Sequence, residues 1–142
     1  MNLFFDSSAL LKRYLNEKGS AATKNLFDNS DKVFVSATTH IECASAFQRL
    51  LQTRHINKKE YQLLNHELSL DFQFFETIHF DDDIKHIALQ VLEKYTLKAL
   101  DTIQLASLVY VGEETDWFVV CDNKLKKYAQ EEGFKLIDPT EK

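Results

Sequence analysis

The sequence predicts an α/β fold, a three-layer sandwich in which a central parallel sheet of about four to five short strands has helices on both faces. Short apolar runs alternate along the chain with longer segments in which apolar residues recur at helical spacing. Glycine occurs only 3 times and proline once, so long loops and linkers are scarce. With 142 residues, 44% of them apolar, the chain can bury one core, and residues 1–142 are expected to form a single domain.

Each predicted strand is a short apolar run, rich in β-branched or aromatic side chains, that ends at a polar residue or a turn. These runs are residues 2–5, 33–35, 74–80, 117–121 and 134–137. Pro139 prevents extension of the last one. Because helical segments separate the strands, the connections are crossovers and the sheet is expected to be parallel.

Each predicted helix has apolar residues three or four positions apart, and several have a capping or terminating residue. These segments are residues 8–16, 20–29, 37–51, 57–70, 81–92, 97–111 and 123–132. Ser36 is a typical N-cap for the third helix. The apolar face of this third helix, residues 37–51, is expected to carry Ile41, Ala44, Phe47 and Leu51. The helix at 97–111 is almost wholly apolar in its second half, which predicts burial on most sides.

Charge and cysteine content narrow the class of protein. The formal charge of −5 argues against broad nonspecific binding to duplexes, although a metal site would itself add acids. Cys43 and Cys121 form no disulfide framework and suit a reducing cytoplasm. The N-terminus has its charges in the wrong order for a signal peptide. No apolar run approaches the ~20 residues that span a bilayer, so a cytoplasmic protein without membrane contact is expected.

Two aspartates follow predicted strands directly. Asp6 comes after the strand at 2–5, and Asp122 comes after the strand at 117–121. Ligands in open α/β sheets bind beyond the carboxyl ends of the strands, so both carboxylates are expected at the ligand-binding edge. Each also precedes a helix, and for either residue taken alone an ordinary N-cap is the alternative interpretation.

Glu42 and Asp101 are the other two candidates. Glu42 lies three residues after Thr39, which also matches a capping box, and it could belong to a solvated stripe of the helix. Asp101 could form a similar box with Gln104. However, it lies in an otherwise apolar helix, where a charge is costly unless it is paired or bound to a metal. The run Asp81-Asp82-Asp83 is interpreted as a helix start and is excluded from the site.

Other chemistries lack their motifs. The histidines do not have the spacing that zinc-binding helices use, and there is no Gly-rich phosphate loop or G-x-S-x-G turn. A phosphoryl-accepting receiver or phosphohydrolase would want a second acid close behind Asp6, where Ser7 and Ser8 stand. A carboxylate site remains, and its hard oxygen ligands suit Mg²⁺ or Mn²⁺.

Four segments around these acids resemble the motifs of PIN domains, in order and over essentially the whole chain. They are Phe5-Asp6-Ser7-Ser8, Thr39-His40-Ile41-Glu42, Leu97-Lys98-Ala99-Leu100-Asp101-Thr102-Ile103-Gln104-Leu105-Ala106 and Phe118-Val119-Val120-Cys121-Asp122-Asn123-Lys124-Leu125. The length and layout are most similar to VapC-type toxins of toxin–antitoxin pairs. One position departs from the family, which often has threonine where Val120 precedes the fourth acid.

The resemblance implies a Mg²⁺- or Mn²⁺-dependent endoribonuclease with Asp6, Glu42, Asp101 and Asp122 as catalytic metal ligands. Ser8 would help to hold the site, and Arg49 and Arg13 are candidates for contacts with substrate phosphates. The resemblance also implies a homodimer and an antitoxin protein that covers the site. The alternatives are a catalytically silent PIN-like binding module and a nuclease that acts on structured DNA.

Overall fold

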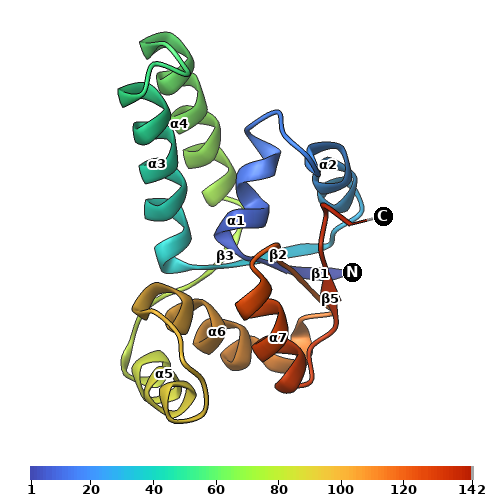
Figure 1. Ribbon diagram of the computed structural model, residues 1–142. Helices are drawn as coiled ribbons and strands as arrows, with labels where there is room; N and C mark the ends of the chain where they lie inside the picture. Colours follow the sequence, from blue (N-terminus) through green and yellow to red (C-terminus); the bar gives the residue numbers. More distant parts are fainter. Residues whose placement is uncertain (142) are drawn as a thin grey trace.

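The computed structural model describes residues 1–141 and contains one five-stranded sheet with helices on both faces (Figure 1). The strands are β1 (Asn2–Phe5), β2 (Lys32–Ser36), β3 (Glu76–Ile78), β4 (Trp117–Val119) and β5 (Leu136–Ile137). The helices are α1 (Ser7–Leu10), α2 (Ser20–Asp28), α3 (Ala37–Gln52), α4 (Lys58–Phe72), α5 (Asp82–Lys94), α6 (Ala99–Val111) and α7 (Asn123–Glu131). Short 3₁₀ turns, η1 (Leu11–Arg13) and η2 (Gly112–Glu114), follow α1 and α6.

All four strand pairings are parallel, in the order β3-β2-β1-β4-β5. The predicted parallel three-layer sandwich is therefore confirmed. β1 lies at the centre of the sheet, with β2 and β3 on one side and β4 and β5 on the other. The carboxyl ends of β1 and β4 meet there, which is the usual ligand-binding position in such sheets.

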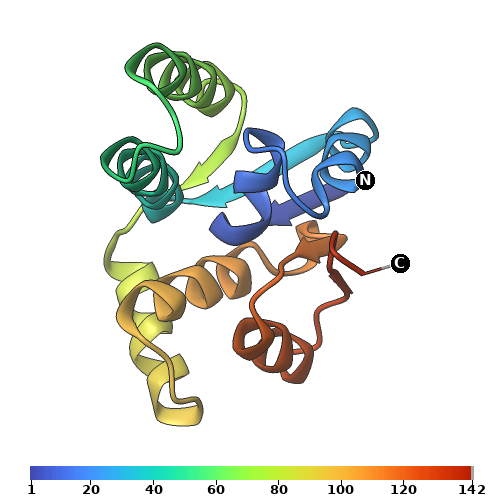
Figure 2. The same cartoon turned by 45° about the horizontal axis from the view of Figure 1, so that its top comes forward.

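Alternation along the strands divides the interior into two apolar layers. Leu3 and Phe5 of β1 pack with α1 and α3 on one face, whereas Phe4 packs with α6 and α7 on the other. Figures 1 and 2 show α1 to α4 on one side of the sheet and α5 to α7 on the opposite side. The side chains of Leu3, Phe4 and Phe5 are all completely buried.

Several helices and strands are shorter than the sequence predicted. The first helix was expected over residues 8–16, but α1 ends at Leu10 and the chain tightens into η1. There Tyr14 N–H donates to the Leu11 carbonyl, a 3₁₀-type bond. The strands expected at 74–80, 117–121 and 134–137 are confirmed in place but pair only over their central or terminal residues.

The predicted apolar face of α3 was wrong in orientation. Only Phe47 of the four expected residues is fully buried, and Ile41 is 73% exposed. The helix instead buries Thr39, Cys43 and Phe47, which recur at four-residue spacing. Ile41 lies two positions from Cys43 and so points to the opposite side of the helix. Glu42, next to it, is consequently at the edge of the buried face rather than in open solvent.

Candidate active site

Asp6 lies at the carboxyl end of the central strand and is almost completely buried. Its backbone N–H still pairs with the Val119 carbonyl at 3.0 Å, which extends the β1–β4 pairing by one residue. Its carboxylate caps α1, because it accepts hydrogen bonds from the Ser8 backbone N–H (3.3 Å) and hydroxyl (2.5 Å). The N-cap interpretation of Asp6 is therefore confirmed. Ser8 thus contacts Asp6 directly, and its role in holding the site stays a prediction.

Burial raises the pKa of Asp6 from 3.8 to about 6, and the nearby charge of Glu42 adds to the rise. The hydrogen bonds from Ser8 act in the opposite direction, because they favour the charged carboxylate. A buried carboxylate with a second acid beside it favours a proton or a cation. This balance makes Asp6 the most strongly perturbed carboxylate of the site.

Glu42 is held by a buried network of neutral polar side chains. Its Oε1 accepts hydrogen bonds from Ser7 (3.0 Å), Thr38 (3.3 Å) and the Gln104 amide (3.2 Å). The same amide nitrogen lies 2.7 Å from the Thr39 hydroxyl and 2.8 Å from the Ser7 hydroxyl. The network joins α1, α3 and α6 directly beneath the sheet edge, and it fixes the position of the Glu42 carboxylate.

The capping-box interpretation of Glu42 was wrong. Ser36 is the N-cap of α3, as predicted, so Glu42 lies in the second turn, beyond the capping positions. The similar box proposed for Asp101 and Gln104 was also wrong, because Lys98 is the N-cap residue of α6. Glu42 therefore lies beyond the capping positions of α3. Asp101 lies in the first turn of α6, where an acid is favourable to the helix dipole, although within residues 1–141 it is not the N-cap residue.

Asp101 is half-buried in the first turn of α6. Burial raises its pKa, and the charges of Asp122 and Glu42 raise it further, whereas Lys98 and Lys124 oppose the rise. The effects on Asp6 and Asp101 link all four predicted acids through space: Asp6 with Glu42, Glu42 with Asp101, and Asp101 with Asp122. The structure thus brings the four carboxylates to the same edge of the sheet.

Asp122 is the exposed member of the set. β4 ends at Val119, earlier than expected, and Asp122 caps α7 by accepting the Leu125 N–H at 2.9 Å. The N-cap interpretation is confirmed here too. Val120, which stands where the family often has threonine, is completely buried in the apolar layer beneath α5, α6 and α7. It therefore contributes to the packing of this apolar layer.

The donor set suits a hard divalent cation. Four carboxylates supply oxygen ligands, and the pKa values of Asp6 and Asp101 are raised first by burial and then by neighbouring acids, a cost of ionisation that a cation would offset. Within residues 1–141, no three acidic, histidine or cysteine side chains lie close enough together to bind one ion as they stand. The chemistry of the residues fits a metal, but within residues 1–141 the acidic side chains are not arranged as a coordination site for one ion.

The two predicted phosphate-binding arginines lie in different environments. Arg13 donates to Asp71 of α4 at 2.8 Å and lies 4.4 Å from the centre of the Phe27 ring. These contacts give Arg13 a structural role that the sequence did not indicate. Arg49 is exposed and donates to Ser45 at 3.1 Å, one turn back on α3 toward Glu42. Substrate binding by either arginine stays a prediction.

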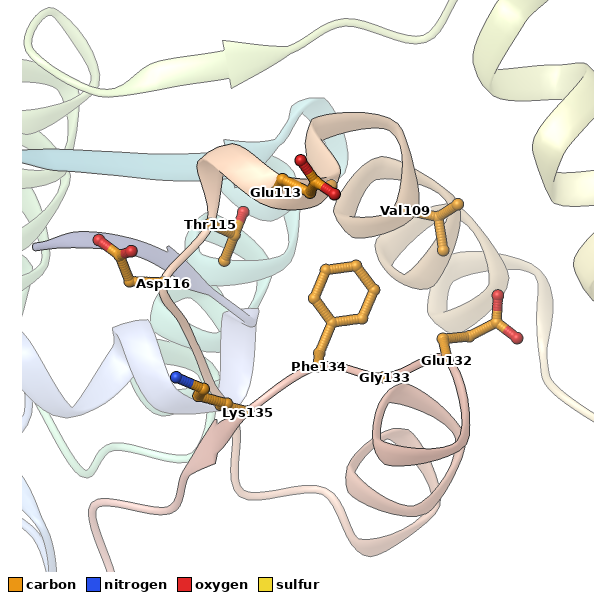
Figure 3. A pocket seen from close by; sticks show the side chains of 9 residues that line it. Val109, Glu113, Thr115, Asp116, Glu132, Gly133, Phe134 and Lys135 are labelled. Carbon is orange, nitrogen blue, oxygen red and sulfur yellow. The ribbon is translucent and has the colours of Figure 1, made fainter.

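A separate cavity of about 480 Å³ opens at the far end of the sheet, before β4 and β5 begin (Figure 3). Phe134 lies on one wall and Val109 on another, and the charged groups include Glu113 and Lys135. The Thr115 hydroxyl, on the same wall as Glu113, is buried without a hydrogen-bond partner within residues 1–141. None of the four acids lines this cavity, so it is distinct from the candidate site.

The fold and the site together define an α/β domain with an acidic candidate centre at the carboxyl edge of a parallel sheet. The chain belongs to the PIN domain family, whose model matches residues 3–131. No curated protein sequence matches the chain significantly. The family assignment therefore rests on the domain model, which covers most of the chain.

Solved structures confirm the likeness in fold. A FitAcB structure from Neisseria gonorrhoeae is 16% identical, with a TM-score of 0.73, over 96% of this chain and 97% of that one. A toxin–antitoxin complex from Klebsiella pneumoniae is 18% identical, with a TM-score of 0.67, over the same shares. The Mycobacterium tuberculosis toxin VapC20, described as cleaving the sarcin–ricin loop, is 14% identical, with a TM-score of 0.66, over 93% and 95%.

Proposed function

We propose that this protein is a divalent-metal-dependent ribonuclease that hydrolyses RNA phosphodiester bonds and serves as the toxin of a toxin–antitoxin pair. The observation that carries the proposal is the convergence of four acids, from four separate segments, on the carboxyl edge of a parallel sheet. Membership of the PIN family and the toxin–antitoxin structures that share the fold support it.

Asp6, Glu42 and Asp101 are the proposed principal ligands of Mg²⁺ or Mn²⁺, and Asp122 completes or tunes the set. When bound, the ion lowers the pKa of the attacking water and offsets the negative charge that develops on the phosphate. Ser8 fixes the carboxylate of Asp6 through its hydroxyl. Gln104, Ser7 and Thr38 bind only Oε1 of Glu42, and within residues 1–141 no donor binds Oε2, which is therefore the oxygen open to an ion.

The residues around the acids supply no other obvious proton acceptor for the attacking water. The thiol of Cys43 is buried beside Glu42 and Asp6, and burial raises its pKa to about 12, so it stays protonated at neutral pH. Activation of the attacking water would therefore be part of the chemistry that a bound metal supplies. A homodimer, an antitoxin partner that covers the acids, and a cytoplasmic location belong to the same proposal. For the membrane, the structural finding is that no helix within residues 1–141 is long and apolar enough to cross a bilayer.

The test is incubation of the purified protein with a mixed cellular RNA pool in Mg²⁺, in Mn²⁺ and in EDTA. An Asp101→Asn variant is the inactivated enzyme, and Asp83→Asn, an exposed acid in the first turn of α5, is the matched control. Discrete fragments that require metal, persist in the Asp83 variant and disappear in the Asp101 variant are expected. No cleavage by folded, antitoxin-free protein would favour a silent binding module, and preferential cleavage of a parallel DNA pool would change the substrate.

A further inference from the structure

Two lysines flank Asp101 on the outer side of the candidate site. Lys98 is the N-cap residue of α6, and its carbonyl accepts bonds from the Thr102 N–H (2.9 Å) and hydroxyl (2.8 Å), which fix the backbone there. Lys124 lies in the first turn of α7, two residues after Asp122. Their charges are near enough to Asp101 to oppose the rise in its pKa. The acids are therefore bordered by two cations from separate helices.

Both lysines are available for an outside partner. Each is exposed, and neither forms an ion pair within 4 Å in the part of the chain from 1 to 141. Two other basic groups, Lys126 and Arg13, are engaged in ion pairs. Lys126, on the opposite flank of α7, binds Asp138 (2.8 Å) and Glu141 (2.9 Å). The guanidinium of Arg13 is held by Asp71.

A third lysine extends the same surface along α7. Lys127 lies one turn after Lys124 and is exposed, with its Nζ 5.8 Å from the centre of the Tyr128 ring. Tyr128 in turn stacks on Tyr95, with ring centroids 4.5 Å apart. Tyr95 begins the segment between α5 and α6 that leads to Lys98. Figure 1 shows α7 beside α6 on this face of the sheet. Lys98, Lys124 and Lys127 therefore border one region, here named the α6–α7 lysine surface.

We propose that the α6–α7 lysine surface binds the phosphate backbone of a single-stranded nucleic acid next to the four acids, so that the strand passes over α7 rather than over Arg13. The inference deepens the proposed function and rests on it for the identity of the substrate. A protein with a net charge of −5 needs a local group of cations to attract a polyanion past its own acids. Tyr95 and Tyr128 are each partly exposed, so their rings can contact unpaired bases, which a duplex would keep inside its stack.

The test is binding of a fluorescently labelled single-stranded RNA of mixed sequence, measured by anisotropy at about 50, 100 and 200 mM salt. All proteins carry Asp101→Asn and are measured in EDTA, so that no cleavage occurs. The test variant is Lys98→Gln with Lys124→Gln, which keeps the backbone carbonyl that starts α6. The control is Lys58→Gln with Lys59→Gln, two exposed lysines at the start of α4 that give the same change in net charge.

The test variant is expected to bind at least about tenfold more weakly at low salt, and the slope of log affinity against log salt should fall by about 1.4, or about 0.7 per lost phosphate contact. The control should match its parent. Equal weakening in both double variants would overturn the proposal, because net charge alone would then explain the binding. Unchanged binding in the test variant, or equal affinity of the parent for a duplex of the same length, would overturn it as well.

The binding measurement separates this inference from the nuclease proposal. If no RNA is cleaved but the test variant alone loses binding, the lysine surface stands and the catalytic proposal fails. If RNA is cleaved, Lys98→Gln with Lys124→Gln in the active protein should raise KM about tenfold and change kcat much less. Cleavage with an unchanged KM would remove the lysine surface and leave the nuclease intact.

Discussion

The side-chain amide of Gln104 donates to the Glu42 carboxylate at 3.2 Å, across 62 residues of sequence. Gln104 is 1% exposed, and its nitrogen also contacts Ser7 and Thr39, so one neutral side chain of α6 holds α1 and α3 together under the site. Its Oε1 is buried with no partner within residues 1–141. A buried amide with an unsatisfied oxygen is costly, which indicates that its position is set by the groups that its nitrogen binds.

Replacing Gln104 with leucine should weaken both the site and the fold. The change removes the donor shared by Glu42, Ser7 and Thr39, and leaving buried acceptors unpaired costs about 1–3 kcal/mol of unfolding free energy. Because Glu42 would lose part of its support, kcat should fall about 10- to 100-fold with a smaller change in KM. Urea unfolding and initial-rate kinetics provide the two measurements.

The control for that variant is Gln130→Leu, which makes the same chemical change on the exposed side of α7. Its stability should change by less than ~0.5 kcal/mol, and its activity should match the parent. If Gln104→Leu kept the full kcat while losing stability, Gln104 would be a packing residue that does not position Glu42.

Three of the four candidate acids stood out by a local rule, whereas Glu42 became a candidate through the family resemblance. Asp6 and Asp122 come after buried apolar runs, and parallel strands place such residues at one edge. Asp101 stood out as a charge in an apolar helix. The same rule, applied to uncharged groups, would have singled out Gln104, since it precedes the apolar stretch that begins at Leu105. Its partners could not be found in this way, because they belong to two other helices.

Two other errors, the apolar face of α3 and the end of α1, have one physical origin, which is tertiary contact overriding local pattern. Ile41 fits the helical periodicity of α3, yet the helix turns Cys43 and Phe47 inward against α1 and α4. The helix after β1 stops at Leu10, while Arg13 and Tyr14 both bind Asp71 of α4. Periodicity identifies that a helix exists, but the neighbouring elements decide which face is buried and where the helix ends.

The raised pKa of Asp6 predicts an unusual pH dependence for the metal-free protein. Since the folded-state pKa of about 6 lies above the ordinary 3.8, the group favours the folded state at pH below about 4, and this contribution is lost as the pH rises through 6. The loss amounts to up to about 3 kcal/mol. In EDTA, the unfolding free energy of Asp6→Asn relative to the parent should therefore increase between pH 4 and pH 7.

Addition of metal to the parent and to Asp6→Asn gives a second test of the same carboxylate. At pH 7, millimolar Mg²⁺ or Mn²⁺ should raise the melting temperature of the parent, because the ion binds only the folded protein. The same addition should have little effect on Asp6→Asn, which lacks one charged ligand. A constant difference between the two proteins from pH 4 to pH 7 would contradict the perturbed pKa of Asp6. Equal stabilisation of both by metal would place the ion elsewhere.

Two glycines with nearly the same φ angle should differ sharply in their tolerance of alanine. Gly19 and Gly133 have φ angles of 93° and 95°, in the left-handed region, where a side chain costs about 1–2 kcal/mol. A Cβ at Gly133 would meet no atom within 4 Å, whereas one at Gly19 would lie 2.9 Å from the Pro139 carbonyl oxygen and 3.0 Å from Lys12 Cδ.

Because the Pro139 oxygen is backbone, the segment after β5 must move to admit a methyl group at Gly19. Gly19→Ala should therefore lose about 1–3 kcal/mol more unfolding free energy than Gly133→Ala, which bears only the conformational cost. Urea denaturation of the two variants at the same pH measures the difference. Equal losses would mean that the segment around Pro139 yields freely, and that the contact between the chain after α1 and the C-terminal segment contributes little to the stability of the fold.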